Sequence, residues 1–228
     1  MKNLAIIPAR KGSKGVKDKN IKLLKGKPLM AHTIQAAIDS EMFDRIIVST
    51  DSEYYASIAR KYGADVPFLR DTANSSDNAS SWDVVKEVLS KLKNVGQTFD
   101  SFALLQPTSP LRDGSDIKKA YKVLKQKYAE SIVSVCEMEH SPLWSNVLPQ
   151  DHSLAHFIRQ EGEKKRQDLE KYYRLNGAIY IATVNSFLEK NTVYGEKSFA
   201  YIMETSKSVD IDTELDFIIA EAIMDTLS

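Results

Sequence analysis

The alternation of short apolar runs with amphipathic segments constrains the fold of this chain more than any other feature. The apolar runs are short and rich in β-branched residues, which predicts strands at 4–8, 45–50, 66–69, 102–106, 131–137, 177–182 and 199–203. Apolar residues spaced three and four apart predict helices at 28–40, 53–62, 80–93, 115–128 and 214–227. Strands that alternate with helices of this length favour an α/β fold with a mostly parallel sheet covered on both faces.

This alternation is interrupted between residues 139 and 171. The interruption contains Pro142, Pro149, three of the four histidines and a charge-dense run at 159–171. A chain of 228 residues is of a size for one main domain. We therefore expect residues 1–138 and 172–228 to form one α/β domain, and residues 139–171 to form an insertion that leaves its sheet.

The composition excludes several classes of protein. Lysine and arginine together number 31, as do aspartate and glutamate, so the net charge is zero and no overall field attracts nucleic acid or an anionic membrane. The single cysteine, Cys136, excludes an internal disulfide framework. No apolar run approaches the length of about 18 residues that a membrane span requires. We expect a soluble cytoplasmic protein with neither nucleic acid nor a membrane as partner.

The loop predicted after the first strand carries a dense local positive charge. Residues 10–27 contain eight lysines and arginines against a single acid, Asp18, and glycines at positions 12 and 15 where the backbone must bend. Ligands of open α/β sheets bind at the carboxyl ends of strands, and glycine lets backbone N–H groups approach phosphate oxygens. The loop therefore predicts a phosphate site, although a solvated lysine-rich loop would have the same composition.

Two aspartates near the end of the chain, Asp210 and Asp212, alternate with Val209 and Ile211. In an extended strand alternate side chains share a face about 6.6–7 Å apart, so the two carboxylates would point the same way. Such a pair can hold Mg²⁺, which binds through one or two carboxylates and substrate phosphates. Alternatively, Asp212 caps the helix predicted to follow it. The sequence leaves both interpretations open.

Two further segments place polar residues beside predicted strands. In 106–112 (QPTSPLR) two prolines favour a rigid turn, which we expect to present Gln106, Thr108 and Arg112 at the sheet edge. In 174–177 (RLNG) the guanidinium of Arg174 could clamp a phosphate. Either segment could instead be a structural turn or a surface charge.

Other signals do not define a site. His152 and His156 are four residues apart, but there is no H-E-x-x-H and no third ligand nearby. Walker A, dinucleotide-binding and nucleophile-elbow motifs are absent from the sequence. A hydrolase of phosphorylated sugars would want a nucleophilic aspartate after the first strand, where this chain has 8–10 (PAR). A non-catalytic nucleotide-binding module would not require the paired aspartates.

Six segments, in order along nearly the whole chain, form a pattern that is specific although each segment alone is weak. They are 6–21 (IIPARKGSKGVKDKNI), 43–51 (FDRIIVSTD), 75–81 (SSDNASS), 104–112 (LLQPTSPLR), 176–180 (NGAIY) and 210–216 (DIDTELD). The pattern resembles that of the acylneuraminate cytidylyltransferases, also called CMP-sialic acid synthetases. The resemblance implies a three-layer Rossmann-like nucleotide-diphospho-sugar transferase fold. It also implies that CMP from CTP is joined to a nine-carbon sugar acid, with release of pyrophosphate.

The same resemblance implies roles for individual residues around the nucleotide. Those that would engage the CTP phosphates are Arg10, Lys19 and Asn20. Those that would lie around the cytosine are Arg70, Ala79 and Ser81. Arg10 and Lys19, together with the two aspartates, would be the catalytic residues.

On the sugar side the resemblance implies a second group. Gln106 would contact the sugar or the ribose, and Arg166 and Arg174 would face the sugar carboxylate and phosphates. The 176–180 segment would contribute Asn176 and Tyr180 to substrate binding. Asp210 and Asp212 would hold an obligatory divalent cation, Mg²⁺ or Mn²⁺. The 139–171 insertion would form a small dimerisation domain that reaches over the partner's active site in a homodimer.

The sequence leaves the identity of the sugar open. Some family members place paired phenylalanines against the N-acyl group after the 176–180 strand, whereas this chain reads NTVYG at 191–195. The stretch 141–157 (SPLWSNVLPQDHSLAHF) is also atypical of enzymes for N-acetylneuraminate. The acceptor could be N-acetylneuraminate or a dideoxy diamino relative such as legionaminate or pseudaminate.

Overall fold

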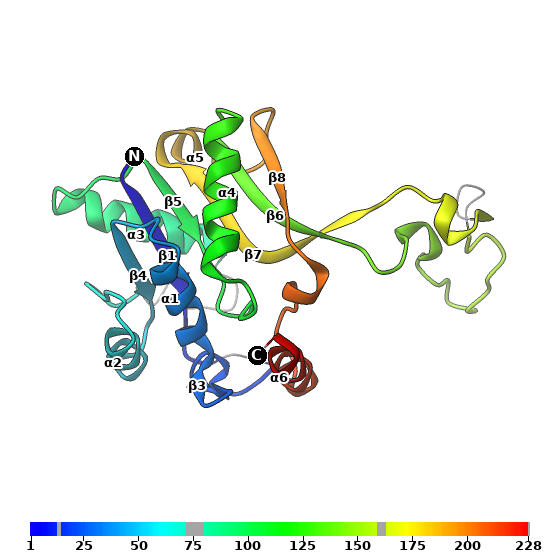
Figure 1. The fold of residues 1–228 in the computed structure, drawn as a ribbon, viewed down its shortest axis with the longest axis horizontal. Helices are drawn as coiled ribbons and strands as arrows, with labels where there is room; N and C mark the ends of the chain where they lie inside the picture. The colour runs from blue at the N-terminus through cyan, green and yellow to red at the C-terminus, as the bar shows by residue number, and fades with distance from the viewer. Residues whose placement is uncertain (13–14, 72–79, 159–162, 228) are drawn as a thin grey trace.

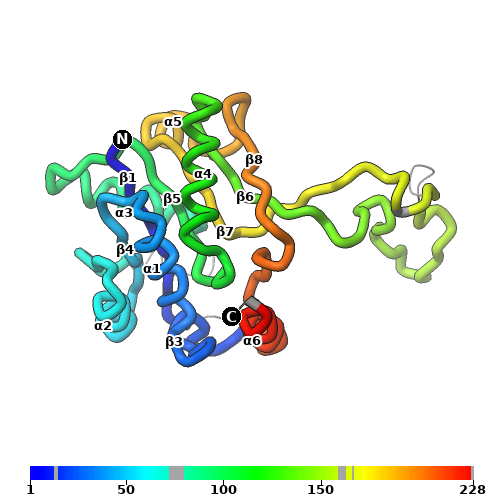
Figure 2. Tube along the Cα trace, in the orientation of Figure 1, coloured from blue at the N-terminus to red at the C-terminus, as the bar shows by residue number. Residues whose placement is uncertain are grey.

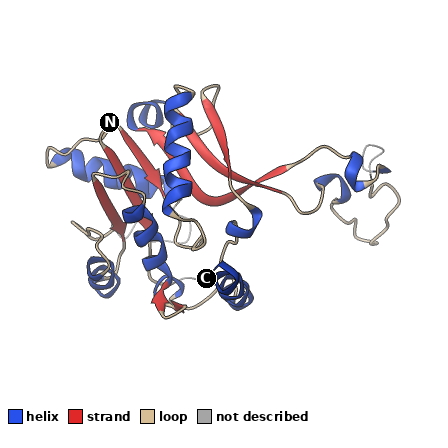
Figure 3. Ribbon diagram, in the orientation of Figure 1, coloured by secondary structure: helices blue, strands red, loops and turns tan. Residues whose placement is uncertain are grey.

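A six-stranded sheet forms the centre of the computed structural model, which describes residues 1–12, 15–71, 80–158 and 163–227 (Figures 1 and 3). From one edge to the other the strands are β4 (Arg45–Ser49), β1 (Asn3–Pro8), β5 (Ser101–Leu104), β7 (Tyr173–Thr183), β6 (Ser131–Glu137) and β8 (Ser198–Ile202). Strand β7 is antiparallel to both of its neighbours, and the other pairs in the sheet are parallel. The mostly parallel sheet that the sequence predicts is confirmed.

The helices of the described residues are α1 (Leu29–Asp39), α2 (Glu53–Lys61), α3 (Ser81–Asn94), α4 (Gly114–Gln126), α5 (Val184–Lys190) and α6 (Glu214–Leu227). On β1, Ala5 and Ile7 join a core with residues of α1, α2 and α4. Leu4 and Ile6 alternate with them and join a second core with residues of α3 and α5. Helices therefore cover both faces of the sheet, and the predicted three layers are confirmed (Figure 1). No helix within the described ranges is both long and apolar enough to cross a membrane.

A third, smaller core joins the two ends of the chain. Phe217 of α6 packs with Val16 of the loop after β1 and with Leu24 of a short hairpin. Ile211, which precedes α6, is fully buried in the same core. The strands of the hairpin are β2 (Leu23–Leu24) and β3 (Lys27–Pro28). The last helix thereby holds the segment before it against the loop after β1.

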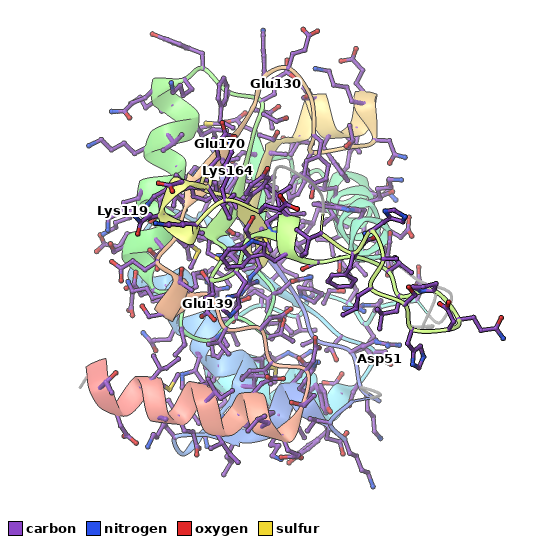
Figure 4. All side chains as sticks on the ribbon, turned by 90° about the vertical axis from the view of Figure 1, so that its right-hand side faces the viewer. Asp51, Lys119, Glu130, Glu139, Lys164 and Glu170 are labelled. Atoms are coloured by element: carbon purple, nitrogen blue, oxygen red, sulfur yellow. The ribbon has the colours of Figure 1, made fainter. Side chains whose placement is uncertain are left out.

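The insertion projects from the body as an arm, the name used below for residues 139–171. Figures 1 and 2 show the arm extending sideways from the ends of β6 and β7. Figure 4 faces it end-on and labels three of its charged residues, Glu139, Lys164 and Glu170. Among the residues of the arm that the structure describes, Pro142–Trp144 form the 3-10 helix η3 and Arg166–Asp168 form η5. The expectation that this segment leaves the sheet agrees with the structure.

Apolar side chains on the arm are partly exposed. Val147, Leu148 and Leu154 are exposed to solvent, whereas Trp144 and Phe157 are half-buried. Exposed apolar side chains on a projecting segment are typical of a surface that contacts another protein. Dimerisation through the arm stays a prediction.

The strand predicted at 66–69 is absent from the sheet. Residues 66–69 form no ladder: Asp65 makes an isolated bridge with Ile47, and Pro67 has no N–H group to continue it. Residues 209–213 are extended in part but pair with no strand of the described chain. Helix α5 and the hairpin were not predicted, because runs this short carry little periodicity.

Candidate active site

A cleft of about 320 Å³ opens at the carboxyl ends of β1 and β5. These neighbouring strands connect to helices on opposite faces of the sheet, since α1 follows β1 and α3 precedes β5. Open α/β sheets bind ligands at such a switch point. The predicted site residues that line the cleft are Arg10, Lys19, Asn20, Arg70, Ser81, Gln106 and Asp212. Pro8, Gly15, Val84, Pro107 and Thr108 complete the lining.

The loop after β1 is fixed by hydrogen bonds to its own backbone and to the neighbouring strand. The amide of Asn20, which is buried, donates to the Arg10 carbonyl at 3.0 Å. The backbone N–H of Lys11 donates to Asp51, which follows β4, at 2.8 Å. Tyr55 donates its hydroxyl to Asp18 at 2.8 Å. The described part of the loop therefore presents its cationic side chains from a fixed backbone.

Gly15 lies against the segment that carries the aspartates. A Cβ atom at position 15 would lie 2.4 Å from the backbone oxygen of Asp212, closer than real Cβ contacts allow. Glycine permits this close approach of two backbones. A glycine in the cationic loop was visible in the sequence as a sign of a close approach. The segment that Gly15 contacts is almost 200 residues away in the chain and could not be predicted.

Lys19 connects the same two segments. Its Nζ atom lies 3.0 Å from Oδ1 of Asp212 and donates to the Ile211 carbonyl at 2.6 Å. Ile211 in turn donates its N–H to the carbonyl of Thr108, which follows β5, at 2.8 Å. One wall of the cleft thus carries the cations Arg10 and Lys19 and the other, called the acidic wall below, carries Asp212. The Lys19–Asp212 ion pair joins the two walls.

Asp210 and Asp212 interact although they do not share a strand face. The pKa of Asp210 is raised, first by burial of its carboxyl group and also by the charge of Asp212. A hydrogen bond from the Thr108 side chain and the charges of Lys19 and Arg174 oppose this rise. The shared strand face considered for the two aspartates is not formed, because Ile211 donates its N–H to the loop after β5 instead of to a neighbouring strand. The two carboxylates nevertheless lie close enough to influence each other.

Asp212 does not cap α6. Thr213 precedes the helix and accepts the Asp216 N–H on its hydroxyl at 3.4 Å, while Asp216 accepts the Thr213 N–H at 2.7 Å. This reciprocal pair is a capping box. Asp216 also accepts the backbone N–H of Asp212 at 3.0 Å, so the box orients the segment before the helix. The alternative that Asp212 is the cap is therefore wrong, and its carboxylate faces the cleft.

Arg70 and Ser81 form the far wall of the cleft. Arg70 is buried and donates to Ser49 through Nε at 3.0 Å and through Nη2, to the carbonyl, at 2.6 Å. Burial lowers the pKa of Arg70 to about 10, so the side chain remains a cation at neutral pH. Ser81 is the first residue of α3, which Ser80 caps with Asp83. Ala79, predicted beside them, lies outside the described residues.

The residues of β7 divide into two kinds. Arg174 donates to the Ser208 carbonyl at 3.2 Å and lies near enough to Asp210 to lower its pKa. Tyr180 is half-buried, packs edge-on against Trp82 at 5.4 Å between ring centroids, and senses the charge of Asp210. Neither residue lines the cleft, but both border its acidic wall.

Asn176, in contrast, is turned into the protein. It accepts a hydrogen bond from Ser134 at 2.6 Å and donates to Ser208 at 2.9 Å. With 1% of its surface exposed, it supports the strand and is closed to a ligand. Arg166 is the first residue of η5 on the arm.

Arg112 differs from its predicted position. It is 1% exposed and donates from Nη1 to the carbonyls of Gln106 at 3.3 Å and Ala178 at 3.1 Å. Within the described chain its Nε and Nη2 atoms have no hydrogen-bond partner, and burial lowers its pKa to about 10. Arg112 thus points away from the sheet edge and supports the turn from beneath.

Gly177 allows the Gln106 side chain to reach β7. Gly177 has a φ of +74°, and a Cβ there would lie 2.6 Å from Oε1 of Gln106. The Asn-Gly pair at 176–177 is a sequence signal for this conformation, which residues with side chains rarely adopt.

The aspartate pair fits a divalent cation that takes its other ligands from a substrate. The described residues contain no group of three or more His, Cys, Asp or Glu side chains able to hold a metal. Mg²⁺ commonly binds through only one or two carboxylates and completes its shell with phosphates and water. A cation, the Lys19 ammonium, already lies on Asp212.

Comparisons with known proteins agree on one family. The sequence profile described as Cytidylyltransferase matches residues 4–225. The N-acylneuraminate cytidylyltransferase of Escherichia coli is 42% identical over 224 residues, which are 97% of this chain and 52% of that protein. The CMP-N,N'-diacetyllegionaminic acid synthase of Legionella pneumophila is 40% identical over 232 residues, 99% of this chain and 97% of that protein. The chain therefore spans about half the length of the first relative and nearly all of the second.

A solved structure has the same fold. CMP:2-keto-3-deoxy-manno-octonic acid synthetase complexed with CTP superimposes with a TM-score of 0.75, covering 100% of both chains at 16% identity. At that identity the likeness shows the fold alone.

Proposed function

Because the chain belongs to the cytidylyltransferase family and is thus a nucleotidyltransferase, we propose that it joins CMP from CTP to the anomeric hydroxyl of a sialic-acid-like sugar acid. Pyrophosphate is the leaving group. The observation that carries the proposal is the cleft at the β1–β5 switch point, where Arg10, Lys19 and Asp212 converge.

The reaction is an in-line displacement at the α-phosphorus. The sugar hydroxyl attacks, its oxygen bonds to phosphorus, the α–β bridging oxygen leaves with pyrophosphate, and the hydroxyl proton passes to solvent or a nearby base. Such a transfer depends on positioning and charge neutralisation rather than on a covalent intermediate. Arg10 and Lys19 would bind the phosphates that leave, where their charge grows in the transition state.

Mg²⁺ or Mn²⁺ would be held by Asp210 and Asp212. When bound, such a cation polarises phosphate oxygens and lowers the pKa of a coordinated hydroxyl. The fixed contact between Ile211 and Thr108 supports this role, because it anchors the segment in which Asp212 lines the cleft and Asp210 lies near enough to feel its charge.

Arg70 and Ser81, with Ala79, would surround the cytosine on the α3 side. Gln106 would contact the ribose or the sugar, and Arg174 and Tyr180 would lie beside the sugar acid. The buried position of Asn176 supports an indirect role, in which it orients β7 for these neighbours.

The arm would pair two copies into a dimer. Its exposed apolar residues Val147, Leu148 and Leu154 favour burial against a second chain. Arg166 begins η5 on the arm, so an arm that reaches the second chain would bring Arg166 to the partner's sugar site.

The sugar itself can be N-acetylneuraminate, legionaminate or pseudaminate. The two relatives named above carry names with different sugars at nearly equal identity, which supports the sugar class without selecting a member. The test is pyrophosphate release with CTP and a panel of these acids. Release with one or more of them supports the proposal, and no release with any nonulosonic acid in the presence of Mg²⁺ contradicts it.

A further inference from the structure

We propose that Lys19 keeps the divalent cation away from Asp212 until nucleotide is bound, and so sets the order in which the two bind. This inference rests on the proposed function, because it takes CTP and a divalent cation as the ligands of the cleft. The contact that carries it is the one between the Lys19 ammonium, the Asp212 carboxylate at 3.0 Å and the Ile211 carbonyl at 2.6 Å.

The two partners of this ion pair differ in their exposure to solvent. The Lys19 side chain is 12% exposed, whereas the Asp212 side chain is 74% exposed. An ammonium so poorly hydrated needs protein acceptors, and both of its acceptors here belong to residues 211–212. The carboxylate, in contrast, could take a hydrated cation from solvent if Lys19 released it.

Lys19 has two competing partners in the cleft. It lines the same space as Arg10, where phosphates would lie, and it also covers Oδ1 of Asp212. A lysine is a compact charge on a flexible stem, so its ammonium can swing between an aspartate and a phosphate. A triphosphate offers more negative charge than one carboxylate, and Lys19 would move to it. Asp212 would then be open to a divalent cation.

The consequence is a coupling between the two ligands. Without nucleotide, a divalent cation must displace Lys19 and binds weakly. With nucleotide bound, the displacement has already occurred and the cation binds more tightly. By thermodynamic linkage the cation must strengthen nucleotide binding by the same factor.

A purely structural role for Lys19 predicts the opposite result when the residue is changed. If Lys19 only ties the loop after β1 to residues 211–212, its loss loosens Asp212 and weakens cation binding. If Lys19 competes with the cation, its loss strengthens cation binding. The sign of the change therefore separates the two roles.

The experiment measures Mn²⁺ binding to the nucleotide-free protein by titration calorimetry, without CTP or sugar. Lys19→Gln should bind Mn²⁺ about two- to fivefold more tightly than the unchanged protein, the range expected for one removed ion pair. Adding Asp212→Asn to this variant should abolish the gain.

The matched control is Arg174→Gln. Arg174 also lies near the aspartates, but its hydrogen bonds go to the carbonyls of Leu175 and Ser208. A smaller gain in this control supports direct competition by Lys19. An unchanged or weaker affinity in Lys19→Gln, or an equal gain in Arg174→Gln, overturns the proposal. Since no turnover is measured, the result stands whether or not any sugar acid is a substrate.

Discussion

The side of the cleft that we propose for the phosphates and the side that we propose for the sugar are built in different ways. On the phosphate side, side chain and backbone contacts join residues far apart in the chain: Lys19 binds the carbonyl of Ile211, 192 positions away, and Gly15 lies against Asp212. On the sugar side, Arg174 and Tyr180 only border the cleft, and Asn176 is turned into the core.

This difference indicates which half of the site one chain can form alone. The phosphate side needs only contacts between the loop after β1, the loop after β5 and the residues before α6. Arg174, on the proposed sugar side, lies near the start of β7, which follows the arm directly in the chain, so a second copy bound through the arm would lie near this side. The shared chemistry and the variable sugar choice would then belong to separate parts of the molecule.

The largest effect should follow from a change on the phosphate side. Asp212→Asn should lower turnover at least about a hundredfold, because it removes a charge that would hold the cation. The melting temperature should hardly change, since Thr213 and Asp216 form the cap of α6. Product formation would be measured with and without chelator. Near-normal synthesis by this variant would contradict the assignment of a cation to Asp212.

The next effect concerns the cations. Arg10→Ala, and separately Lys19→Ala, should lower kcat/KM for CTP about 10- to 150-fold, the cost of one charge-assisted phosphate contact. Lys118→Gln serves as a control. Lys118 lies on α4 away from the cleft, and its ion pair with Glu41 is exposed to solvent. Unchanged kcat/KM in both loop variants, measured by pyrophosphate release, would remove this loop from the mechanism.

The division between the two sides can be tested by mixing variants. Arg166→Ala should raise the KM for the sugar acid about tenfold while CTP binding stays unchanged. If Arg166 acts on the partner's cleft, co-expression of Arg166→Ala with Asp212→Asn should yield about a quarter of the normal sites, since only mixed dimers contain an intact one. The mixed sample could instead show only the activity that its Arg166→Ala sites would give by themselves. That result would mean that Arg166 acts on the cleft of its own chain or on neither cleft.

The smallest effect on activity should follow from a change at Arg112, which lies beneath the turn after β5. Arg112→Met replaces a buried guanidinium, two of whose nitrogens have no hydrogen-bond partner in the described chain, by an apolar side chain of similar length, so the stability should change little. The Gln106 carbonyl would lose one of its donors, so the KM for substrates should rise about threefold. Thermal unfolding and kinetics on the same sample would check both parts. A large loss of stability would show that Arg112 holds the fold rather than the turn.

The elements of the fold could largely be predicted, because their signals are local. Periodicity located each strand of the main sheet and five of the helices that the structure describes. The exceptions have physical reasons: Pro67 cannot continue a ladder, and α5 and the hairpin are too short to show a period.

The composition of the cleft could also be predicted, but the directions of its side chains could not. A cationic loop and an aspartate pair were visible in the sequence, whereas the Lys19–Asp212 contact depends on packing between the two ends of the chain. Arg112 was predicted at the surface because an arginine after a proline turn is usually solvated, yet the turn folds over it. Asp212 was a candidate cap because aspartate is a favoured N-cap residue. The actual cap, Thr213, is the next residue and is also of a favoured type, so the sequence could not distinguish the two.

The small core between α6 and the loop after β1 has a consequence for how the protein is made. A ribosome adds residues from the amino terminus, at about 5–20 per second, so the strands are complete before α6 is synthesised. Until Ile211 and Phe217 leave the ribosome, Val16 of the loop after β1 and Leu24 of the hairpin lack the residues that complete their core. A nascent chain would therefore acquire its sheet first and its acidic wall last, and a fragment cut short before residue 209 would be folded in large part yet unable to hold the nucleotide in place.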